Sequence, residues 1–236
     1  MALSSLAGLP VEMGWRHVLF ASWPVEPSVV EAHLPNDLEA DTYDGQAWLS
    51  VVPFTNATVK PRGLPDALGF GLPELNLRTY VTCDGVPGVY FFSLDAEGVL
   101  GVAGARLFHH LPYYYARISL QGVSGRVHFE SKRLHPGERP AHFTATYGPV
   151  GDRLDVEAGS RAEFLTARYR YFTQDPNERV RVADIEHERW PLYEAEADID
   201  VNTLFTADGF AHPGGDPVLH YSPGVDVTAT GSRRWG

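Results

Sequence analysis

The stretch Glu74–Ala116, ELNLRTYVTCDGVPGVYFFSLDAEGVLGVAGARLFHHLPYYYA, decides the fold that we expect for this chain. Its first residues alternate between apolar and polar side chains, which is the pattern of a strand with two different faces. Asp84-Gly85 and Pro87-Gly88 supply turn residues, and Val89–Asp95 is strand-like again. We therefore expect a β-hairpin whose first strand carries a polar row along one face: Glu74, Asn76, Arg78 and Tyr80.

The second half of this stretch is expected to form a short helix followed by another strand. Glu97–Phe108 is rich in Ala, Leu and Val, and Leu111-Pro112 ends the helix because the residue before proline avoids the α region. The run Tyr113–Tyr115 then begins a new strand. The polar row and this aromatic strand start could face each other across a cavity, which makes the stretch the best candidate for a site.

Short strands dominate the remaining sequence. Alternating segments, separated by turn residues such as Asp44-Gly45, are Trp15–Trp23, Gln46–Val52, Ala116–Gln121, Arg126–Leu134, Ala141–Tyr147, Arg168–Phe172, Arg179–His187 and Val218–Thr230. Short helices are expected at Ser28–His33 and, behind a capping box, at Ser160–Thr166. The acidic segment Leu192–Phe205 suggests partial helix. Thr58–Pro73, after a strand that ends at Pro53-Phe54, suggests a long loop that is either a cavity wall or a plain surface connection.

These patterns predict a mainly β protein, a β-rich α+β fold with a few short helices. No repeat, low-complexity segment or linker interrupts residues 1–236, so we expect a single domain. Long βαβ spacing is absent, which predicts a mostly antiparallel sheet that forms a barrel or a sandwich.

The composition excludes several classes of function. A formal net charge of −11 argues against nucleic acids and anionic membrane surfaces as partners. The N-terminus lacks a basic stretch followed by an apolar run, and no apolar run is long enough to cross a bilayer, so a cytoplasmic protein is expected. The single cysteine, Cys83, excludes an intramolecular disulfide and is interpreted as a small core residue.

Motifs for common cofactors and metals are absent. Gly69-Phe70-Gly71 is only a fragment of a dinucleotide loop, and Leu72-Pro73 follows where a helix should start. The chain has no phosphate-binding loop and no nucleophile elbow. The pair His109-His110 could suggest a metal site, but the side chains of adjacent residues on a helix point about 100° apart and do not usually converge on one metal ion. We therefore expect neither a metal nor a cofactor.

Several motifs of this sequence resemble those of a known family. LNLRTYV, GVYFFSLDA and HLPYYYA, together with the late HYSPGVDV, are similar to segments of the uncharacterised DUF2071 family of YqjF-like proteins. The similarity runs from about Trp15 to about Val227. That family is thought to share the fold of acetoacetate decarboxylases, so the resemblance implies a β-barrel or cone with short peripheral helices.

The resemblance also implies that the chemistry of acetoacetate decarboxylases is lost. Those enzymes carry a G-R-E-x-x-G-[FY]-P-K-K-x-A segment, in which the first lysine forms a Schiff base. Gly104, Pro112 and Ala116 match this frame, but Tyr113 and Tyr114 stand at the two lysine positions. A glutamate that faces the lysine in those enzymes matches Glu74.

A Schiff base needs a primary amine inside the pocket, and tyrosine cannot form an imine. The chain has only two lysines, Lys60 in the Pro/Gly segment and Lys132 at the end of a predicted strand. Neither obviously replaces the missing amine, so decarboxylation through an imine is not expected.

The site hypothesis centres on the polar row and the tyrosine run. The alternating pattern alone also allows a solvent-facing row, whereas the resemblance implies that the row looks into the barrel. The tyrosines are equally compatible with core packing and with lining a pocket. The candidate catalytic residues are Glu74, Arg78 and Tyr113, and the candidate ligand-binding residues are Asn76, Tyr80, His109 and Tyr114.

Three classes of function remain open. We favour a protein that binds or transforms a small anionic or carbonyl-containing molecule without a Schiff base, either as a binder or as a lyase- or hydratase-like acid–base enzyme. The alternative is a non-catalytic structural or interaction protein whose cavity is filled by side chains. The sequence is compatible with a homo-oligomer but does not fix the oligomeric state.

Overall fold

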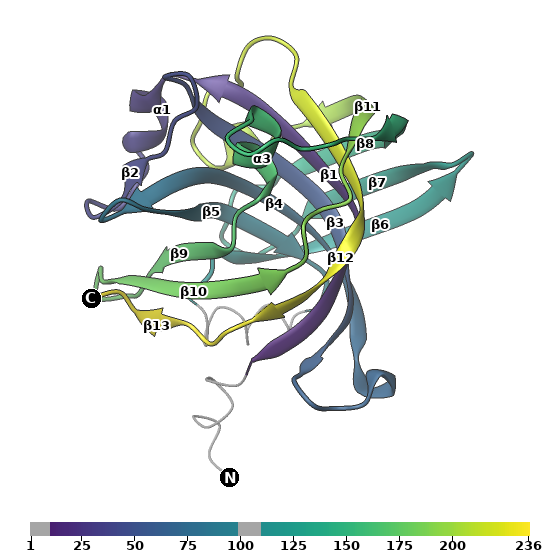
Figure 1. The fold of residues 1–236 in the computed structure, drawn as a ribbon, viewed down its shortest axis with the longest axis horizontal. Helices are drawn as coiled ribbons and strands as arrows, with labels where there is room; N and C mark the ends of the chain where they lie inside the picture. Colours follow the sequence, from purple (N-terminus) through teal and green to yellow (C-terminus); the bar gives the residue numbers. More distant parts are fainter. Residues whose placement is uncertain (1–9, 99–109) are drawn as a thin grey trace.

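Long, strongly curved strands form most of the molecule (Figure 1). The computed structural model describes residues 10–98 and 110–236. The strands are β1 (Val11–Val25), β2 (Glu39–Ala40), β3 (Ala47–Pro61), β4 (Phe70–Cys83), β5 (Val86–Ala96), β6 (Tyr113–Val123), β7 (Arg126–Arg133), β8 (His142–Arg153), β9 (Arg170–Gln174), β10 (Val180–His187), β11 (Tyr193–Asn202), β12 (Val218–Ala229) and β13 (Arg233–Arg234). The predicted mainly β class is confirmed.

The helices are short: α1 (Pro27–Glu31), the 3-10 helix η2 (Asp66–Leu68), α3 (Arg161–Thr166) and α4 (Leu204–Ala207). Helices α1 and α3 confirm the two predictions near Ser28–His33 and Ser160–Thr166. The helix expected over Glu97–Phe108 lies almost wholly outside the described residues, and its first two residues, Glu97 and Gly98, are not helical. Within the described ranges, no helix is long and apolar enough to cross a membrane.

All the strands belong to one sheet, in the order β13-β10-β9-β5-β6-β7-β8-β11-β12-β1-β3-β4-β2. Strand β5 also pairs with β4, and β10 also pairs with β12. Because of the β4–β5 pairing, a series of paired strands that starts at β4 returns to it: β4-β5-β6-β7-β8-β11-β12-β1-β3-β4. Strands β9 and β10 form a second path between β5 and β12 (Figure 1). Among the described pairs only β5–β6 and β5–β9 are parallel, so the sheet is mostly antiparallel as predicted.

Strands β1, β3 and β4 form a wall with a hydrophobic core on each side. Successive side chains of a strand point to opposite faces. Leu75 and Leu77 of β4 enter one core, which β7 and β8 help to complete with Phe129 and Phe143. Tyr80 enters the other core, which is covered by α3, β9 and β10. The polar row of β4 lies on this second face, so it faces the interior and not solvent.

The predicted turn residues are found at the hairpins. Asp84 and Gly85 connect β4 to β5 with φ angles of 51° and 75°, which are typical of a type I′ turn. The Asp44-Gly45 pair repeats this conformation before β3. The hairpin on which the site prediction rests is therefore confirmed, with the register that places Glu74 opposite Ala96.

The prediction of partial helix over Leu192–Phe205 is wrong for most of that segment. It forms strand β11, and only its end enters helix α4. In β11 the partly buried Ala195, Ala197 and Ile199 alternate with exposed acidic side chains. The acidic residues cover the solvent side of a strand, because a period of two puts them all on one face.

The prediction of a long loop over Thr58–Pro73 is also wrong. Strand β3 continues through Pro53 to Pro61, and β4 begins at Phe70, so the segment is the end of a hairpin that projects from the body (Figure 1). Pro53 pairs with Leu75 of β4 but lies where the pairing of β3 with β1 is interrupted, between Arg16 and Ala21. A proline lacks the backbone N–H group, and this interruption lets the strand tolerate it.

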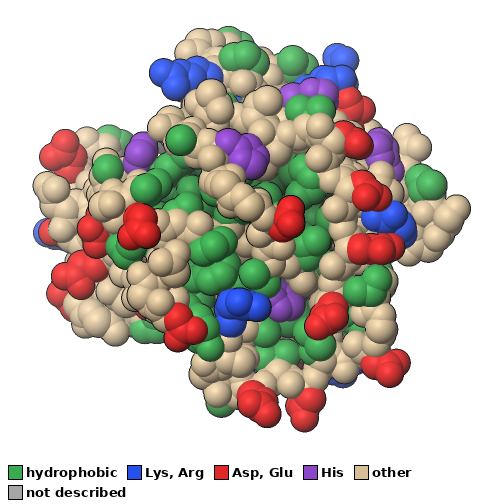
Figure 2. Space-filling view, turned by 90° about the horizontal axis from the view of Figure 1, so that it is seen from above, with side chains coloured by type: hydrophobic (Ala, Val, Ile, Leu, Met, Phe, Trp, Pro, Cys, Tyr) green, Lys and Arg blue, Asp and Glu red, His purple; other side chains and the backbone are tan. Residues whose placement is uncertain are grey.

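Acidic residues outnumber basic ones in this chain, 30 Asp and Glu against 19 Lys and Arg. Figure 2 shows more acidic than basic side chains on the face seen from above, and they are spread over it. This distribution agrees with the net charge of −11. Strand β11 contributes an exposed row of its own, in which Asp198 binds Arg126 at 3.0 Å.

Candidate functional site

Glu74 is the centre of the candidate site. It lies on β4 opposite Phe54 of β3, and only 5% of its surface is exposed. Its Oε2 atom accepts hydrogen bonds from Nδ2 of Asn56 at 3.0 Å and from the hydroxyl of Tyr113 at 2.9 Å. Among the described residues no cationic side chain forms an ion pair with it.

The carboxyl group of Glu74 has a strongly perturbed pKa. Burial raises the pKa from 4.5 to about 7. Hydrogen bonds from Tyr113, Asn56 and Asn76 oppose this rise because they stabilise the carboxylate, whereas the charge of Asp95 adds to it. The group is therefore poised to gain or lose a proton near neutral pH.

Tyr113 reaches Glu74 from a neighbouring strand. It is the first residue of β6 and pairs in parallel with Leu94 at the end of β5. Burial raises the pKa of its phenol well above the ordinary value, and the charge of Glu74 raises it further. The phenol therefore stays protonated and donates its hydrogen to Glu74. The structure thus brings two of the three candidate catalytic residues into direct contact.

Two buried amides flank the carboxyl group. Asn76 was a candidate ligand-binding residue, but Asn56 was missed because it lies on the part of β3 beyond Pro53-Phe54, where the sequence predicted the strand to end. Both are buried, and within the described ranges the Oδ1 atom of each has no hydrogen-bond partner. An unsatisfied buried acceptor costs about 1–3 kcal/mol, so two of them beside a carboxyl group call for an explanation.

Arg78 lies further along the same face of β4 and does not pair with Glu74. Its Nη2 atom donates to the carbonyl oxygen of Leu165 in α3 at 3.3 Å, and its guanidinium group lies over the ring of Phe20 at 5.3 Å. Its Nε atom is buried and has no partner among the described residues. Glu74 is therefore not an anionic partner of Arg78, and the Nε–H group of Arg78 remains available as a donor on the buried face.

Two further candidates have other surroundings. The hydroxyl of Tyr80 donates to the carbonyl oxygen of Leu165 at 2.6 Å, so we assign this residue to packing beneath α3. Tyr114 alternates with Tyr113 along β6, and its ring lies under the guanidinium group of Arg133 at 4.4 Å. His109 lies outside the described residues.

A second group of buried charges lies near the first and was not predicted. Arg133 of β7 donates from Nε to Asp95 at 2.6 Å and from Nη1 to Asp208 at 2.8 Å. The hydroxyl of Ser93 also donates to Asp208. Burial raises the pKa of Asp95 to about 7, although Arg133 partly offsets this effect. The charge of Asp95 in turn raises the pKa of Glu74, so the two groups are electrostatically linked.

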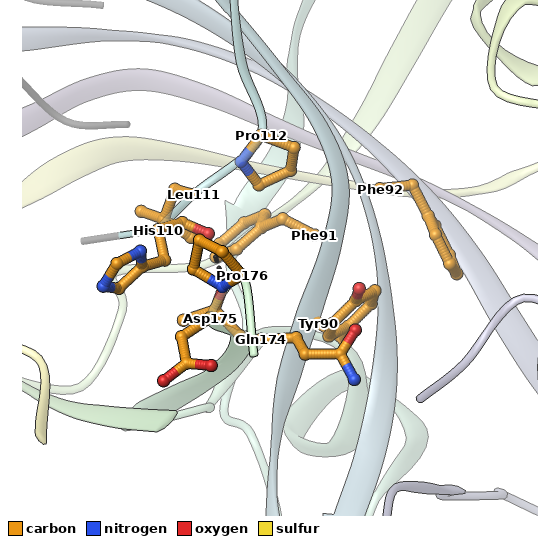
Figure 3. A pocket seen from close by; sticks show the side chains of 10 residues that line it. Tyr90, Phe91, Phe92, His110, Leu111, Pro112, Gln174, Asp175 and Pro176 are labelled. Atoms are coloured by element: carbon orange, nitrogen blue, oxygen red, sulfur yellow. Dashed lines mark hydrogen bonds between the residues drawn. The ribbon is translucent and has the colours of Figure 1, made fainter. Parts of the chain in front are cut away.

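A cavity of about 420 Å³ lies at the edge of β5, where β6 and β9 separate (Figure 3). Strand β9 pairs with the start of β5 and β6 with its end, and among the described pairings Phe91–Ser93 has no partner on this edge. His110, Leu111 and Asp175 are among the residues that line the cavity. Leu111 packs in the same hydrophobic core as Tyr113, which binds Glu74.

Both lysines lie away from this site. Lys60 binds Glu12 at 2.8 Å and Asp66 at 3.2 Å on the projecting hairpin, and its contact with Glu12 raises its pKa. Lys132 forms a contact of 2.5 Å with Glu130 within β7. A lysine that forms a Schiff base presents a free amine inside a pocket, whereas both lysines of this chain form ion pairs.

Sequence comparison assigns nearly the whole chain to one group of proteins. The DUF2071 family, described as an uncharacterized conserved protein, matches residues 12–226. The uncharacterized protein YqjF of Bacillus subtilis (strain 168) is 45% identical over 222 residues, which cover 94% of this chain and 90% of that protein.

Solved structures of low sequence identity share the fold. Acetoacetate decarboxylase from Legionella pneumophila superposes with a TM-score of 0.70 at 14% identity, over 96% of this chain and 87% of that one. The enduracididine biosynthesis enzyme MppR, in complex with the condensation product of pyruvate and imidazole 4-carboxaldehyde, has a TM-score of 0.70 at 14% identity, over 95% and 88% of the two chains. The expected acetoacetate decarboxylase-like fold is therefore confirmed.

Proposed function

The chain belongs to the DUF2071 family, and from this premise we propose that it binds a small organic acid or carbonyl compound against the polar row of β4 and transforms it by acid–base chemistry. We infer that the strands form a barrel or cone, as the acetoacetate decarboxylase-like fold implies, and that this barrel or cone encloses the ligand. Glu74 and Tyr113 are the catalytic pair in this proposal, and Arg78 and Asn76 position the ligand.

The buried carboxyl group of Glu74 is the observation that carries this proposal. It has no cationic partner among the described residues, and burying such a group is costly unless it can change its protonation state. Perturbed carboxyl groups of this kind are typical of functional sites, where a pKa near the working pH suits a general acid or base. Purely structural carboxyl groups are usually paired when they are buried.

The fold neighbours support the chemical class of the ligand. Acetoacetate decarboxylase is a decarboxylase by name, and MppR was solved with pyruvate as well as with a pyruvate condensation product. The compounds in these names, acetoacetate and pyruvate, are small acids that also carry a carbonyl group. At 14–15% identity the neighbours share only the fold with this chain, so the ligand class remains a proposal that rests on the site.

The chemistry we propose is proton exchange at Glu74. As a carboxylate it accepts a proton from the ligand, and as a carboxylic acid it returns one. The phenol of Tyr113 donates to the carboxylate and thereby stabilises its charge. No imine is involved, since both lysines form ion pairs away from Glu74.

We expect borohydride to trap no adduct. Wild-type protein incubated with pyruvate and sodium borohydride should keep its unmodified mass, because Schiff-base formation needs an amine in the pocket. Intact-protein mass spectrometry is the measurement, with an acetoacetate decarboxylase as the positive control. A reduced pyruvate adduct mapped to Lys60 or Lys132 would contradict the proposal that this chemistry proceeds without an imine.

We expect Arg78→Ala to weaken the binding of a carboxylate ligand by roughly tenfold to a hundredfold, because a hydrogen bond to a charged group contributes about 1.5–3 kcal/mol. Arg78→Lys should recover only part of this loss, since the planar fork of donors is absent. A thermal-shift screen of small carboxylates and carbonyl compounds on wild type and both variants is the measurement. Identical shifts in all three proteins would remove Arg78 from the site.

One observation favours the alternative of a filled interior. The hydroxyl of Tyr113 occupies Oε2 of Glu74, the atom that a ligand would approach. A structural protein would show no ligand-induced shift with any compound of the screen. That result, with folded wild-type protein, would favour the alternative over the proposed function.

A further inference from the structure

We propose that the ligand of this site carries a hydrogen-bond donor, a hydroxyl or an amine, next to its acidic group, and that Asn56 and Asn76 select it. The inference rests on the proposed function and narrows its substrate class to 2-hydroxy or 2-amino acids. It assigns to the two amides a role in specificity.

The orientation of the two amides leaves an acceptor atom of each available to a ligand. Asn56 donates from Nδ2 to Glu74, which turns its Oδ1 atom away from the carboxylate. Asn76 also stabilises the carboxylate of Glu74, which requires its N–H side to face Glu74 and leaves its Oδ1 atom for another donor. Both side chains are more than nine-tenths buried, and their Oδ1 atoms lack partners in the part of the chain that the structure describes. A ligand donor would satisfy these acceptors.

The distribution of charge along the polar row determines which end of the ligand lies at which residue. A carboxylate placed beside Glu74 would meet an acidic group and two acceptor oxygens, all of which disfavour it. At the other end of the row, the Nε atom of Arg78 is buried with no partner among the described residues. The acidic group of the ligand therefore belongs at Arg78 and its donor at Asn76.

The spacing of the row fits such a ligand. Asn76 and Arg78 are two residues apart on one face of β4, so their Cα atoms lie about 7 Å apart along the strand and their side chains are neighbours. A carboxylate with a hydroxyl or an amine on the adjacent carbon can bridge two groups at this separation, since each hydrogen bond spans about 3 Å. A 2-oxo acid has the same length but presents an acceptor to the acceptors of Asn56 and Asn76.

Lactate and pyruvate provide a matched test, because they carry the same charge and differ at C2 only by a hydroxyl in place of a keto group. Isothermal titration calorimetry on the wild-type protein should give a dissociation constant for lactate about tenfold lower than that for pyruvate, the ratio that corresponds to about 1.4 kcal/mol. Alanine, with an ammonium group at C2, should also bind more tightly than pyruvate.

Variants of the two asparagines test whether these residues cause the preference for lactate over pyruvate. Asn76→Leu and Asn56→Leu keep the size of the side chain but remove the acceptor, so each should reduce the ratio between lactate and pyruvate severalfold. Asn36→Leu, at an exposed asparagine in the turn after α1, is the matched control and should leave the ratio unchanged. The comparison of ligands on wild type decides the inference even if a buried variant fails to fold.

The outcomes separate the two proposals. Equal affinities, or a tighter complex with pyruvate, would overturn the selection of a donor and leave the proposed function standing. A preference for lactate that survives in both folded asparagine variants would overturn the role of the amides. If none of the three compounds binds saturably, this inference falls, and the proposed function falls with it only if no other compound of the thermal-shift screen binds.

Discussion

Replacing Glu74 by Gln is expected to stabilise the protein by about 3 kcal/mol more at pH 8 than at pH 4.5. Burial raises the pKa of Glu74 from its ordinary value of 4.5 to about 7 in the folded chain. The folded state therefore binds more protons than the unfolded state in this interval, and the contribution of Glu74 to stability falls as the pH rises through it. Gln is neutral at every pH and avoids this loss.

Urea unfolding of wild type and Glu74→Gln at pH 4.5, 6 and 8 measures the effect. The difference in unfolding free energy should grow between pH 4.5 and 7 and then level off. Glu196→Gln, at an exposed position of β11, is the control and should show a difference that does not vary in this way. A constant difference for Glu74→Gln across the series would show that the carboxyl group does not titrate with a raised pKa.

The same variant separates stability from function. Gln offers an acceptor to Asn56 and Tyr113, and its amide N–H group can donate to an unpartnered Oδ1 atom, so we expect it to fold well. It cannot exchange a proton, so any turnover should be lost while stability rises. This opposition is the general pattern when a functional group is buried at a cost to the fold.

Local signals in the sequence predicted the parts of the fold that depend on near neighbours. Asp84-Gly85 fixed the β4–β5 hairpin because both residues adopt positive φ, and Ser160 caps α3 by accepting from the backbone N–H of Glu163. Strand β11 was missed because two of its inward side chains are small alanines between acidic residues, a composition that resembles an exposed helix. The continuation of β3 was missed because Pro53 depends on an interruption in its pairing with β1.

Residue patterns alone predicted the candidate site only along one strand, whereas Tyr113 on β6 was predicted from the family resemblance. Glu74, Asn76 and Arg78 share a face of β4, and alternation alone groups them. That both faces of this strand are buried follows from the strands that pack on either side, which no local pattern reveals. Asn56 enters the site through the unexpected part of β3.

Arg133→Met is expected to cost about 3–5 kcal/mol of stability at pH 8. The guanidinium group binds Asp95 at 2.6 Å and Asp208 at 2.8 Å, and its side chain is only 2% exposed. These three residues come from distant parts of the chain, so the cluster left no signal in the sequence. Met fills much of the same volume but leaves two buried carboxyl groups without their cation. Urea unfolding at pH 8 and at pH 5 is the measurement.

The pH dependence separates lost charge from lost packing. Arg133 lowers the pKa of Asp95, which burial has raised to about 7, so the variant should raise that pKa further. A carboxyl with a raised folded pKa loses stability as the pH rises, and the deficit of the variant should therefore grow above about pH 7. At pH 5 Asp95 is largely protonated in both proteins, so the deficit should be smaller there. Adding Asp95→Asn to Arg133→Met should remove most of the pH dependence, whereas a deficit that is equal at both pH values would assign the loss to packing alone.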